Sequence, residues 1–379
     1  MRVVHVYKDV YPVKGGIEDY ILPVCAHLRR DHGIDARILV TSTTRRTEKT
    51  EIDGVPVVKA GRIATVKSAP IGPMLPALLR ELKADIVHLS APYPIGELAY
   101  LAVARNTPMV MTYHSDIVRQ KTLGRLYGPF FEAVLRRAYA ILATSPQYAA
   151  SSPWLRRHRK HVRVLTSGII LEPYLHPTDS NVRLAKQLRQ QLGSRVLYSH
   201  GVFRYYKGLH YLIEAMPSIP NTTLLLTGRG PEEAALREQV TKLGLDHRVV
   251  FAGPVGDDVL PAYYLASDVY VLPAIARSEA LGLSMVQAQA SGLPCLSTEI
   301  GTGTSYVNLE GETGLVVPPQ DAHALARAAV QLLGDCDLRS RFGLRAREHA
   351  HVFDLVEITA QIATLYREIA ATCAVHNTA

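Results

Sequence analysis

The sequence predicts two α/β domains, each built on a doubly wound parallel sheet, and three observations carry this prediction. Short apolar runs typical of buried strands alternate with amphipathic helical stretches along nearly the whole chain. The alternation is interrupted at residues 166–180, where prolines and polar residues indicate a linker. With 379 residues, the chain has room for two domains of ordinary size. We therefore expect domains at 1–175 and 176–354, followed by a last helix at 355–379.

In the first half, the apolar runs predict a series of short strands. They lie at residues 3–7, 35–41, 55–59, 85–90, 109–116, 140–145 and 162–165. Helices are expected from Gly16 to about residue 30, over 72–82, from Tyr93 onward, before Tyr139 and across the basic run 154–163. The polar stretch 44–49 predicts a loop.

The second half repeats the pattern. Strands are expected at residues 196–201, 223–227, 248–251, 268–273, 292–299 and 313–318. Helices are expected at 182–192, 208–216, from Glu232, at 257–266, after Gly282, and at 321–333, 337–350 and 355–374. Doubly wound sheets bind ligands beyond the carboxyl ends of their strands, so the loops that follow the strands are where a site is expected.

Composition and charge narrow the classes of function. Residues 1–175 carry 25 Lys and Arg against 14 Asp and Glu, whereas the rest carry 17 against 20. A basic half is typical of a solvated face, but it also fits an anionic membrane surface or a phosphorylated lipid. Nucleic acid is disfavoured because the basic residues fall in separate patches without a recognised motif. No apolar run is long enough to span a membrane, and the sequence shows no signal peptide. The four cysteines are widely separated, which favours reduced thiols and a location in the cytoplasm.

Three loops of the second half combine into a candidate anion site. The first holds Arg204 and Lys207, and the second holds Glu279, with Gln287 in the helix that Gly282 opens. The third spans residues 301–305, where backbone N–H groups and hydroxyls, including those of Gly303 and Thr304, can form a nest for an anion. A basic loop, a nest and a helix N-terminus together predict a diphosphate site. Each of these three features, taken alone, is more often structural than part of a binding site.

The first half offers a second group of candidates. Gly15 and Gly16 precede a helix start, where the backbone can approach a ligand closely. His114 and Asp116 follow the strand 109–116, ahead of the basic residues Arg119 and Lys121. The structural alternatives are a buried core histidine for His114 and a helix cap for Asp116. No cluster has metal-ligand spacing, and no nucleophile elbow is present.

These motifs resemble the glycosyltransferase family 4 pattern of the GT-B superfamily. Ser278-Glu-Ala-Leu-Gly-Leu is similar to the family's E-x-F-G-hydrophobic segment, with Leu281 at the phenylalanine position. Four further segments resemble a bacterial branch of this family that contains mannosyltransferases of surface polysaccharide assembly. They are residues 113–121, 205–208, 298–308 and 311–319. The resemblance runs from residue 1 to nearly the end and implies two Rossmann-like domains facing across a cleft. It also implies that the last helix crosses back onto the first domain.

The resemblance further implies a retaining transfer of a hexose from a nucleotide diphosphate donor, GDP- or UDP-linked, without a metal or other cofactor. Mannose from GDP-mannose is the first expectation, with a lipid-linked or saccharide acceptor. In this picture the second domain binds the donor and the first binds the acceptor. The enzyme would be cytoplasmic, with peripheral attachment to the inner face of the cytoplasmic membrane as an option; its oligomeric state stays open.

Roles follow from motif position. Lys207 would hold the diphosphate, Glu279 the sugar hydroxyls and Gln287 the ribose, and Arg204 would join Lys207 at the diphosphate if its loop turns it inward. His114, Lys207 and Glu279 form the catalytic set implied by the resemblance. The donor-binding set and the acceptor-binding set are larger. The donor would also be contacted by Gly15, Gly16, Leu283, Gly303 and Thr304, and the acceptor by Asp116, Arg119 and Lys121.

Two positions depart from the family pattern. Val202 stands where the family usually has Arg, and Gln287 stands where it usually has Glu. Because Arg binds phosphate bidentately, its absence leaves three alternatives: a slow enzyme, a rearranged phosphate site, or a catalytically impaired subunit that binds a partner. A sugar-nucleotide epimerase is a further alternative, although no additional acid–base carboxylates are identified for it.

Overall fold

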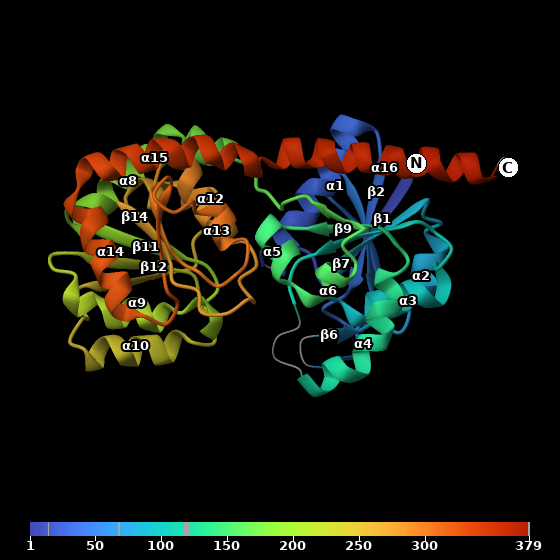
Figure 1. Ribbon diagram of the computed structural model, residues 1–379, viewed down its shortest axis with the longest axis horizontal. Coiled ribbons are helices and arrows are strands. Elements are labelled where there is room, and N and C mark those ends of the chain that lie inside the picture. Colours follow the sequence, from blue (N-terminus) through green and yellow to red (C-terminus); the bar gives the residue numbers. More distant parts are fainter. Residues whose placement is uncertain (14, 67–68, 117–120, 378–379) are drawn as a thin grey trace. The chain divides into compact units, whose positions relative to one another are not determined.

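The computed structural model describes the chain except residues 14, 67–68, 117–120 and 378–379, and leaves out the side chains of 19, 121–126 and 374–377. It forms two compact units (Figure 1). One comprises Met1–Ser167 together with Leu355–Ala379, and the other comprises Gly168–Asp354. The first boundary between the units thus falls at residue 167, whereas the sequence predicts it at residue 175.

The first unit is built on an eight-stranded sheet in the order β10-β9-β8-β7-β1-β2-β4-β3. All neighbouring strands are parallel except β3 and β4. The strands are β1 (Arg2–Val6), β2 (Asp35–Thr41), β3 (Glu48–Ile52), β4 (Val55–Ala60), β7 (Ile86–Ala91), β8 (Met109–Tyr113), β9 (Ala138–Ala143) and β10 (Val162–Val164). A separate hairpin joins β5 (Ala64–Val66) to β6 (Ala69–Ile71). The chain starts in the middle of the sheet and winds outward on both sides, as expected of a doubly wound domain.

The helices of this unit include the last one of the chain. They are α1 (Glu18–His32), α2 (Leu75–Glu81), α3 (Pro94–Val103), α4 (Lys121–Leu135), α5 (Pro146–Ser151), α6 (Pro153–Arg157) and α16 (Leu355–Asn377). Helix α16 lies beside α1 (Figure 1). It therefore completes the unit that the first residues of the chain begin.

A buried cluster fixes α16 to the sheet. His5 of β1 and His88 of β7 are register partners, and their rings stack 4.5 Å apart. The hydroxyl of Tyr366 in α16 is hydrogen-bonded to His88 Nδ1 and lies 3.1 Å from His5 Nε2. Burial lowers the pKa of His5 to about 3 and that of His88 well below its ordinary value, so both rings are neutral at neutral pH. The last helix is thus held by polar bonds as well as by apolar packing.

The second unit contains a six-stranded parallel sheet in the order β13-β12-β11-β14-β15-β16. The strands are β11 (Val196–His200), β12 (Thr223–Thr227), β13 (Val249–Gly253), β14 (Val269–Leu272), β15 (Cys295–Thr298) and β16 (Gly314–Val317). In chain order this is the 3-2-1-4-5-6 arrangement, which reverses direction between β11 and β14. Ligands of such sheets bind at this reversal, beyond the carboxyl ends of the two strands.

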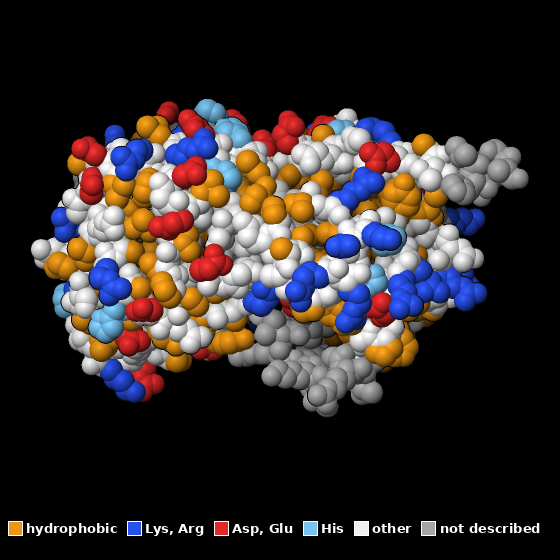
Figure 2. Space-filling model, in the orientation of Figure 1, with side chains coloured by type: hydrophobic (Ala, Val, Ile, Leu, Met, Phe, Trp, Pro, Cys, Tyr) orange, Lys and Arg blue, Asp and Glu red, His pale blue; other side chains and the backbone are white. Residues whose placement is uncertain are grey.

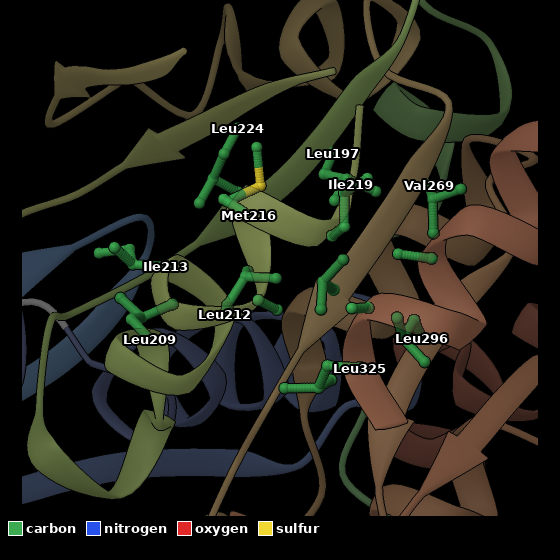
Figure 3. Packing of buried hydrophobic residues seen from close by; sticks show 14 of the residues in the cluster. Leu197, Leu209, Leu212, Ile213, Met216, Ile219, Leu224, Val269, Leu296 and Leu325 are labelled. Carbon is green, nitrogen blue, oxygen red and sulfur yellow. The ribbon is translucent and has the colours of Figure 1, made fainter. Parts of the chain in front are cut away.

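Helices cover both faces of this sheet. They are α7 (Glu172–Leu175), α8 (Asp179–Leu192), α9 (Leu209–Ala215), α10 (Glu233–Lys242), α11 (Leu260–Leu265), α12 (Leu283–Ala290), α13 (Thr304–Val307), α14 (Ala322–Gly334) and α15 (Cys336–Ala350). Side chains alternate between two cores: in β11, Leu197 packs toward α9 and α14, whereas Val196 and Tyr198 pack toward α11 and α12. Figure 3 shows the first of these cores around Leu212 and Leu325. Burial on both faces explains the continuous apolar strands.

Several local expectations are corrected. The polar stretch 44–49 runs into β3, an antiparallel strand that the sequence pattern did not indicate, and the β5–β6 hairpin was also unexpected. The basic run 154–163 is not one helix but most of α6, a turn and the start of β10. The linker contains α7 and the start of α8. No helix in the described ranges is long and apolar enough to span a membrane.

Candidate active site

The loops that follow β11 and β14 are joined to each other at the reversal point of the second sheet. The loop after β11 ends in a 3₁₀ turn, η1 (Tyr205–Lys207), and the N–H of Ile275 donates to the carbonyl of Tyr206 over 2.8 Å. Gly208 makes this approach feasible because a Cβ there would lie 2.0 Å from the carbonyl oxygen of Pro273, and its φ is +66°. Lys207 is therefore delivered to the loop that carries Glu279.

Lys207 and Glu279 form a buried ion pair. Lys207 Nζ lies 2.6 Å from Glu279 Oε2, and the two side chains are 14% and 10% exposed. Burial alone would lower the pKa of Lys207, but the attraction of the Glu279 carboxylate outweighs it and holds this pKa above the ordinary value for lysine. Lys207 is therefore a cation throughout the physiological range. The pair places one cation and one hydrogen-bond acceptor side by side where a ligand is expected.

The loop after β15 supports the Glu279 loop. The Thr302 hydroxyl donates to the Glu279 carbonyl over 2.8 Å, the Gly303 N–H donates to the Ala280 carbonyl over 2.7 Å, and Arg277 Nη1 donates to the Gly301 carbonyl over 2.7 Å. These bonds hold the two loops together, with Gly303 against Ala280, the residue after Glu279, and with the buried Thr304 beginning α13.

The anion nest expected at residues 301–305 is partly occupied by the protein itself. The Gly301 N–H donates to Glu299 Oε1 over 2.7 Å, and the Ser305 hydroxyl is bonded to the same carboxylate. Together with the Gly303 bond, this commits donors that had been expected to face a phosphate. The loop therefore contributes fewer open N–H groups than its sequence predicted, and its main observed contacts position Glu279.

Gln287 lies half-buried on α12, which begins at Leu283 after Gly282. Its Oε1 accepts a hydrogen bond from the Tyr264 hydroxyl over 2.8 Å, and the Tyr174 ring packs edge to face against the Tyr264 ring, with centroids 5.7 Å apart. Nothing in the sequence pattern marks either tyrosine, because Tyr174 belongs to the presumed linker and Tyr264 to an ordinary amphipathic helix. The half-buried Leu283 packs against the core on this face.

The loop after β11 holds Arg204 and Val202 on either side of a buried residue. Phe203 is buried, whereas Arg204 is exposed and Val202 is 38% exposed. The Lys207 N–H donates to the Arg204 carbonyl over 3.0 Å, and no hydrogen bond or ion pair of the described residues joins the Arg204 guanidinium to Glu279. A role for Arg204 in place of the missing arginine at position 202 stays a prediction.

His200 is a site residue that sequence patterns did not single out. It ends β11 directly before this loop, and its Nδ1 lies 2.8 Å from the Thr227 hydroxyl oxygen. Burial and then the nearby Lys207 lower the pKa of His200 to about 4, so the ring is neutral at physiological pH. A histidine at a strand end is a weak signal, and only the sheet order shows that this one faces the reversal point.

In the first unit, Glu18 at the start of α1 forms an ion pair with Lys8, which follows β1. Lys8 Nζ lies 3.4 Å from Oε1 of the buried Glu18. The Glu18 carboxylate folds back so far that a Cβ on Gly15 would lie 2.5 Å from its Oε2. By contrast, the described atoms leave more than 4 Å of space around the position of a Cβ on Gly16. Gly16 is thus the glycine at which a ligand could approach the backbone.

His114 is a buried, neutral group with an unused hydrogen-bonding atom. Its backbone N–H donates to the Ala91 carbonyl over 3.0 Å, but its Nε2 has no partner in the described part of the chain. Burial and then Lys8 lower the pKa of His114 to about 3. A buried polar atom without a partner is uncommon and calls for an explanation, such as a ligand.

The expected acceptor residues behave differently from one another. Asp116 Oδ1 accepts hydrogen bonds from the Tyr113 and Ser152 hydroxyls, each over 2.7 Å, so this carboxylate fastens the loop after β8 to the start of α6. Lys121 begins α4, but its side chain is not described, and Arg119 lies outside the described residues. The alternative in which Asp116 is structural therefore gains support.

The described residues contain no cluster of three or more His, Cys, Asp or Glu side chains able to hold a metal ion. The second unit instead offers Lys207 for phosphate, Glu279 for hydroxyls and a half-buried amide at Gln287. This set suits a polyhydroxylated anion such as a nucleotide sugar.

Comparisons with known proteins agree with this arrangement. Residues 182–349 match the family described as Glycosyl transferases group 1, and residues 15–168 match the Glycosyl transferase 4-like domain. The chain is 37% identical over 331 residues to the D-rhamnosyltransferase WbpZ of Pseudomonas aeruginosa, covering 86% of this chain and 85% of the relative. It is 32% identical over 350 residues to the O-antigen chain mannosyltransferase C of Escherichia coli, covering 92% of each.

Solved structures share the fold across almost the entire chain. Sucrose-phosphate synthase from Thermosynechococcus elongatus matches with a TM-score of 0.83 and 23% identity, over 98% of this chain and 99% of that one. HepE of Anabaena, solved in complex with UDP, matches with a TM-score of 0.78 and 21% identity, over 97% of this chain and 100% of that one. The protein therefore belongs to the group 1 and 4-like glycosyltransferases and has the GT-B fold.

Proposed function

We propose that this glycosyltransferase moves a hexose from a nucleotide diphosphate donor onto a lipid-linked or saccharide acceptor in surface polysaccharide assembly, with retention of the anomeric configuration. The Lys207–Glu279 pair at the reversal point of the second sheet is the observation that carries the proposal. Mannose from GDP-mannose is the first candidate donor, supported by the name of the Escherichia coli relative, whereas the name of the Pseudomonas aeruginosa relative points to D-rhamnose.

Each residue has a defined task in the proposed reaction. Lys207 donates hydrogen bonds to the diphosphate and stabilises the charge that develops on it as the glycosidic bond breaks. Glu279 accepts hydrogen bonds from the sugar hydroxyls and orients the anomeric carbon. Gln287 binds the ribose, and the unpartnered Nε2 of His114 bonds a hydroxyl of the donor sugar.

A ligand screen tests the donor. The melting temperature of the purified protein is measured with GDP-, UDP-, ADP- and dTDP-linked hexoses, and a true donor raises it because it binds only the native state. Incubation of that donor with an acceptor extract, followed by NMR of the product, gives the anomeric configuration. Failure to bind, hydrolyse or transfer any of these sugars would contradict the proposal. Full activity after dialysis against EDTA is expected for a metal-independent transfer.

We place the acceptor's membrane at a surface of the first unit formed by the β5–β6 hairpin, called here the hairpin surface. Ile63, Val66 and Met74 are each more than half exposed there. Exposed Arg45 and Arg46 belong to the loop that is hydrogen-bonded to the start of the hairpin, where the Arg62 N–H donates to the Thr44 carbonyl over 2.7 Å. Apolar side chains beside arginines suit an anionic bilayer surface.

Basic side chains also gather around α5 and α6 of this unit (Figure 2). The exposed ones in the run 154–163 are Arg156, Arg157, Arg159, Lys160 and Arg163. Within residues 154–164, all of which the structure describes, Val164 is the one large apolar side chain that is exposed, so we assign these basic residues long-range attraction to the membrane rather than insertion. Sedimentation with phosphatidylglycerol vesicles, but not with phosphatidylcholine vesicles, is expected, and an Ile63→Ser, Val66→Ser variant should lose it. Equal sedimentation of that variant would contradict the assignment.

A further inference from the structure

The cation of the candidate active site is already paired with a carboxylate of the protein itself. Lys207 Nζ lies 2.6 Å from Glu279 Oε2. The ammonium group is held at the end of β11, because a Cβ on Gly201 would lie 3.8 Å from Nζ. A diphosphate that binds Lys207 must therefore share the ammonium group with Glu279 or displace the carboxylate from it.

The backbone is fixed on both sides of this pair, so an exchange of partners needs rotation of side chains rather than movement of loops. The Glu279 N–H donates to the Ala276 carbonyl over 3.0 Å, and the Glu279 carbonyl accepts from the Thr302 hydroxyl over 2.8 Å. The Lys207 N–H donates to the Arg204 carbonyl over 3.0 Å. The carboxylate and the ammonium group thus stay in the same site whichever partner each of them takes.

Burial makes the loss of either partner costly. The side chains of Lys207 and Glu279 are 14% and 10% exposed, and a charge so far removed from water is strongly unfavourable without a partner. A bare nucleoside diphosphate that takes Lys207 leaves the Glu279 carboxylate in this state and brings further negative charge beside it. A nucleotide sugar differs, because its hydroxyls donate hydrogen bonds to the carboxylate that Lys207 has left.

We propose that the Lys207–Glu279 pair makes the donor site discriminate between a nucleotide sugar and the bare nucleoside diphosphate. This inference rests on the proposed function, because it needs a nucleotide in the second unit. With the donor bound, the sugar hydroxyls hold Glu279 and the diphosphate holds Lys207. Once the hexose has been transferred, Glu279 loses these hydroxyls and pairs with Lys207 again. The site thereby weakens its hold on the product that it must release.

Calorimetry with the full-length protein tests this exchange. Dissociation constants are measured for GDP and GDP-mannose, and in parallel for UDP and UDP-glucose. In Glu279→Gln no anion competes for Lys207, so the nucleoside diphosphate should bind at least about tenfold tighter than in the wild type, the factor expected of a hydrogen bond to a charged group. The nucleotide sugar should not gain affinity, because its hydroxyls lose a charged acceptor. A purely structural ion pair would not separate the two ligands in this way.

Two comparisons isolate the role of Lys207. In a Lys207→Met background, Glu279→Gln should leave the affinity for the nucleoside diphosphate unchanged, because no ammonium group remains to be released. Glu232→Gln is the matched control. Glu232 is half-buried, its N–H donates to the Phe203 carbonyl over 3.1 Å, and no ion pair of the described residues joins it to Lys207. Equal tightening in either comparison would show that the loss of a negative charge is sufficient, and would overturn the exchange.

The unaltered protein gives a second test that does not depend on whether Glu279→Gln folds. Free mannose with GDP, or free glucose with UDP, supplies hydroxyls to Glu279 and should tighten the nucleoside diphosphate, because ligands that relieve the same contact bind cooperatively. An unchanged affinity, or a Glu279→Gln variant that binds the nucleoside diphosphate no tighter than the wild type, would mean that the pair is structural while the proposed function stands. If the wild type binds none of these nucleotides, the proposed function fails and this inference fails with it.

Discussion

Replacing Glu279 by glutamine should destabilise the second unit and make its stability depend on the ligand. The change keeps the shape of the side chain but leaves the Lys207 ammonium, which is only 14% exposed, without its counter-charge. Removing one partner of a buried ion pair typically costs about 3–5 kcal/mol. Because solvent screens this pair little, we expect a loss of about 3 kcal/mol in the free energy of unfolding.

A double-mutant cycle separates this effect from ordinary packing losses. Glu279→Gln, Lys207→Met and the double variant are unfolded in urea, and the transition is followed by far-ultraviolet circular dichroism. Because the double variant has no buried charge, it should be more stable than the sum of the single losses predicts. Strict additivity of the two single changes would refute the reasoning, since it would mean that the ion pair contributes no coupling.

Ligand and pH give independent readings of the same pair. A nucleoside diphosphate supplies Lys207 with a new counter-charge, so GDP or UDP should restore more stability to Glu279→Gln than it adds to the wild type. The raised pKa of Lys207 means that its contribution is fully present below the ordinary lysine value of 10.5 and is lost as pH rises through the folded-state value. Alkaline titration of the unfolding midpoint should therefore show a loss that Lys207→Met lacks.

Four further substitutions and a change of pH have distinct expected outcomes. Gly208→Ala should unfold the site, because the added Cβ would lie 2.0 Å from a carbonyl oxygen. Gly16→Ala should keep the wild-type melting temperature but weaken donor turnover. Equal melting temperatures of the two variants would contradict the steric argument. Val202→Arg should change the free energy of unfolding by no more than about 0.5 kcal/mol, since Val202 is 38% exposed. It should raise kcat if the donor phosphate lies within reach of the new arginine, and an unchanged kcat would exclude a phosphate at that distance. Acid should weaken the first unit, because burial lowers the pKa of His5 to about 3. The contribution of the neutral His5 to stability is fully present above the ordinary value of 6.5 and is lost as pH falls toward 3. The unfolding midpoint at pH 5 should therefore lie below that at pH 7.5. Tyr366→Phe, which removes the phenol shared by the histidines, should cost about 1–3 kcal/mol at neutral pH, and no loss would contradict the polar role of this cluster.

The fold was largely predictable because its strands are buried on both faces. Runs such as Leu224–Leu226 alternate with helices so regularly that the strand–helix order follows from the sequence alone. The exceptions have physical reasons. Strand β3 is almost entirely exposed and polar, so no apolar pattern marks it, and the β5–β6 hairpin is too short to show a period.

The candidate site was predictable in part. Lys207 and Glu279 follow strands, and the order of the sheet brings them within 2.6 Å, as motif positions implied. Contacts between distant segments could not be foreseen: Tyr174 of the supposed linker packs against Tyr264, whose hydroxyl donates to Gln287, and Glu299 occupies donors of the loop that was expected to hold phosphate. Local patterns do not determine which backbone donors a neighbouring side chain will use.

The return of α16 to the first unit has a consequence for the order in which the chain folds during synthesis. The second unit, Gly168–Asp354, is continuous, so all of its strands have left the ribosome before the last helix is made. The first unit begins earlier but stays incomplete, with His5 and His88 lacking the phenol of Tyr366, until residues 355 onward emerge. A chain cut before Leu355 would therefore damage the unit that was synthesised first, and the continuous second unit is the natural piece to produce by itself.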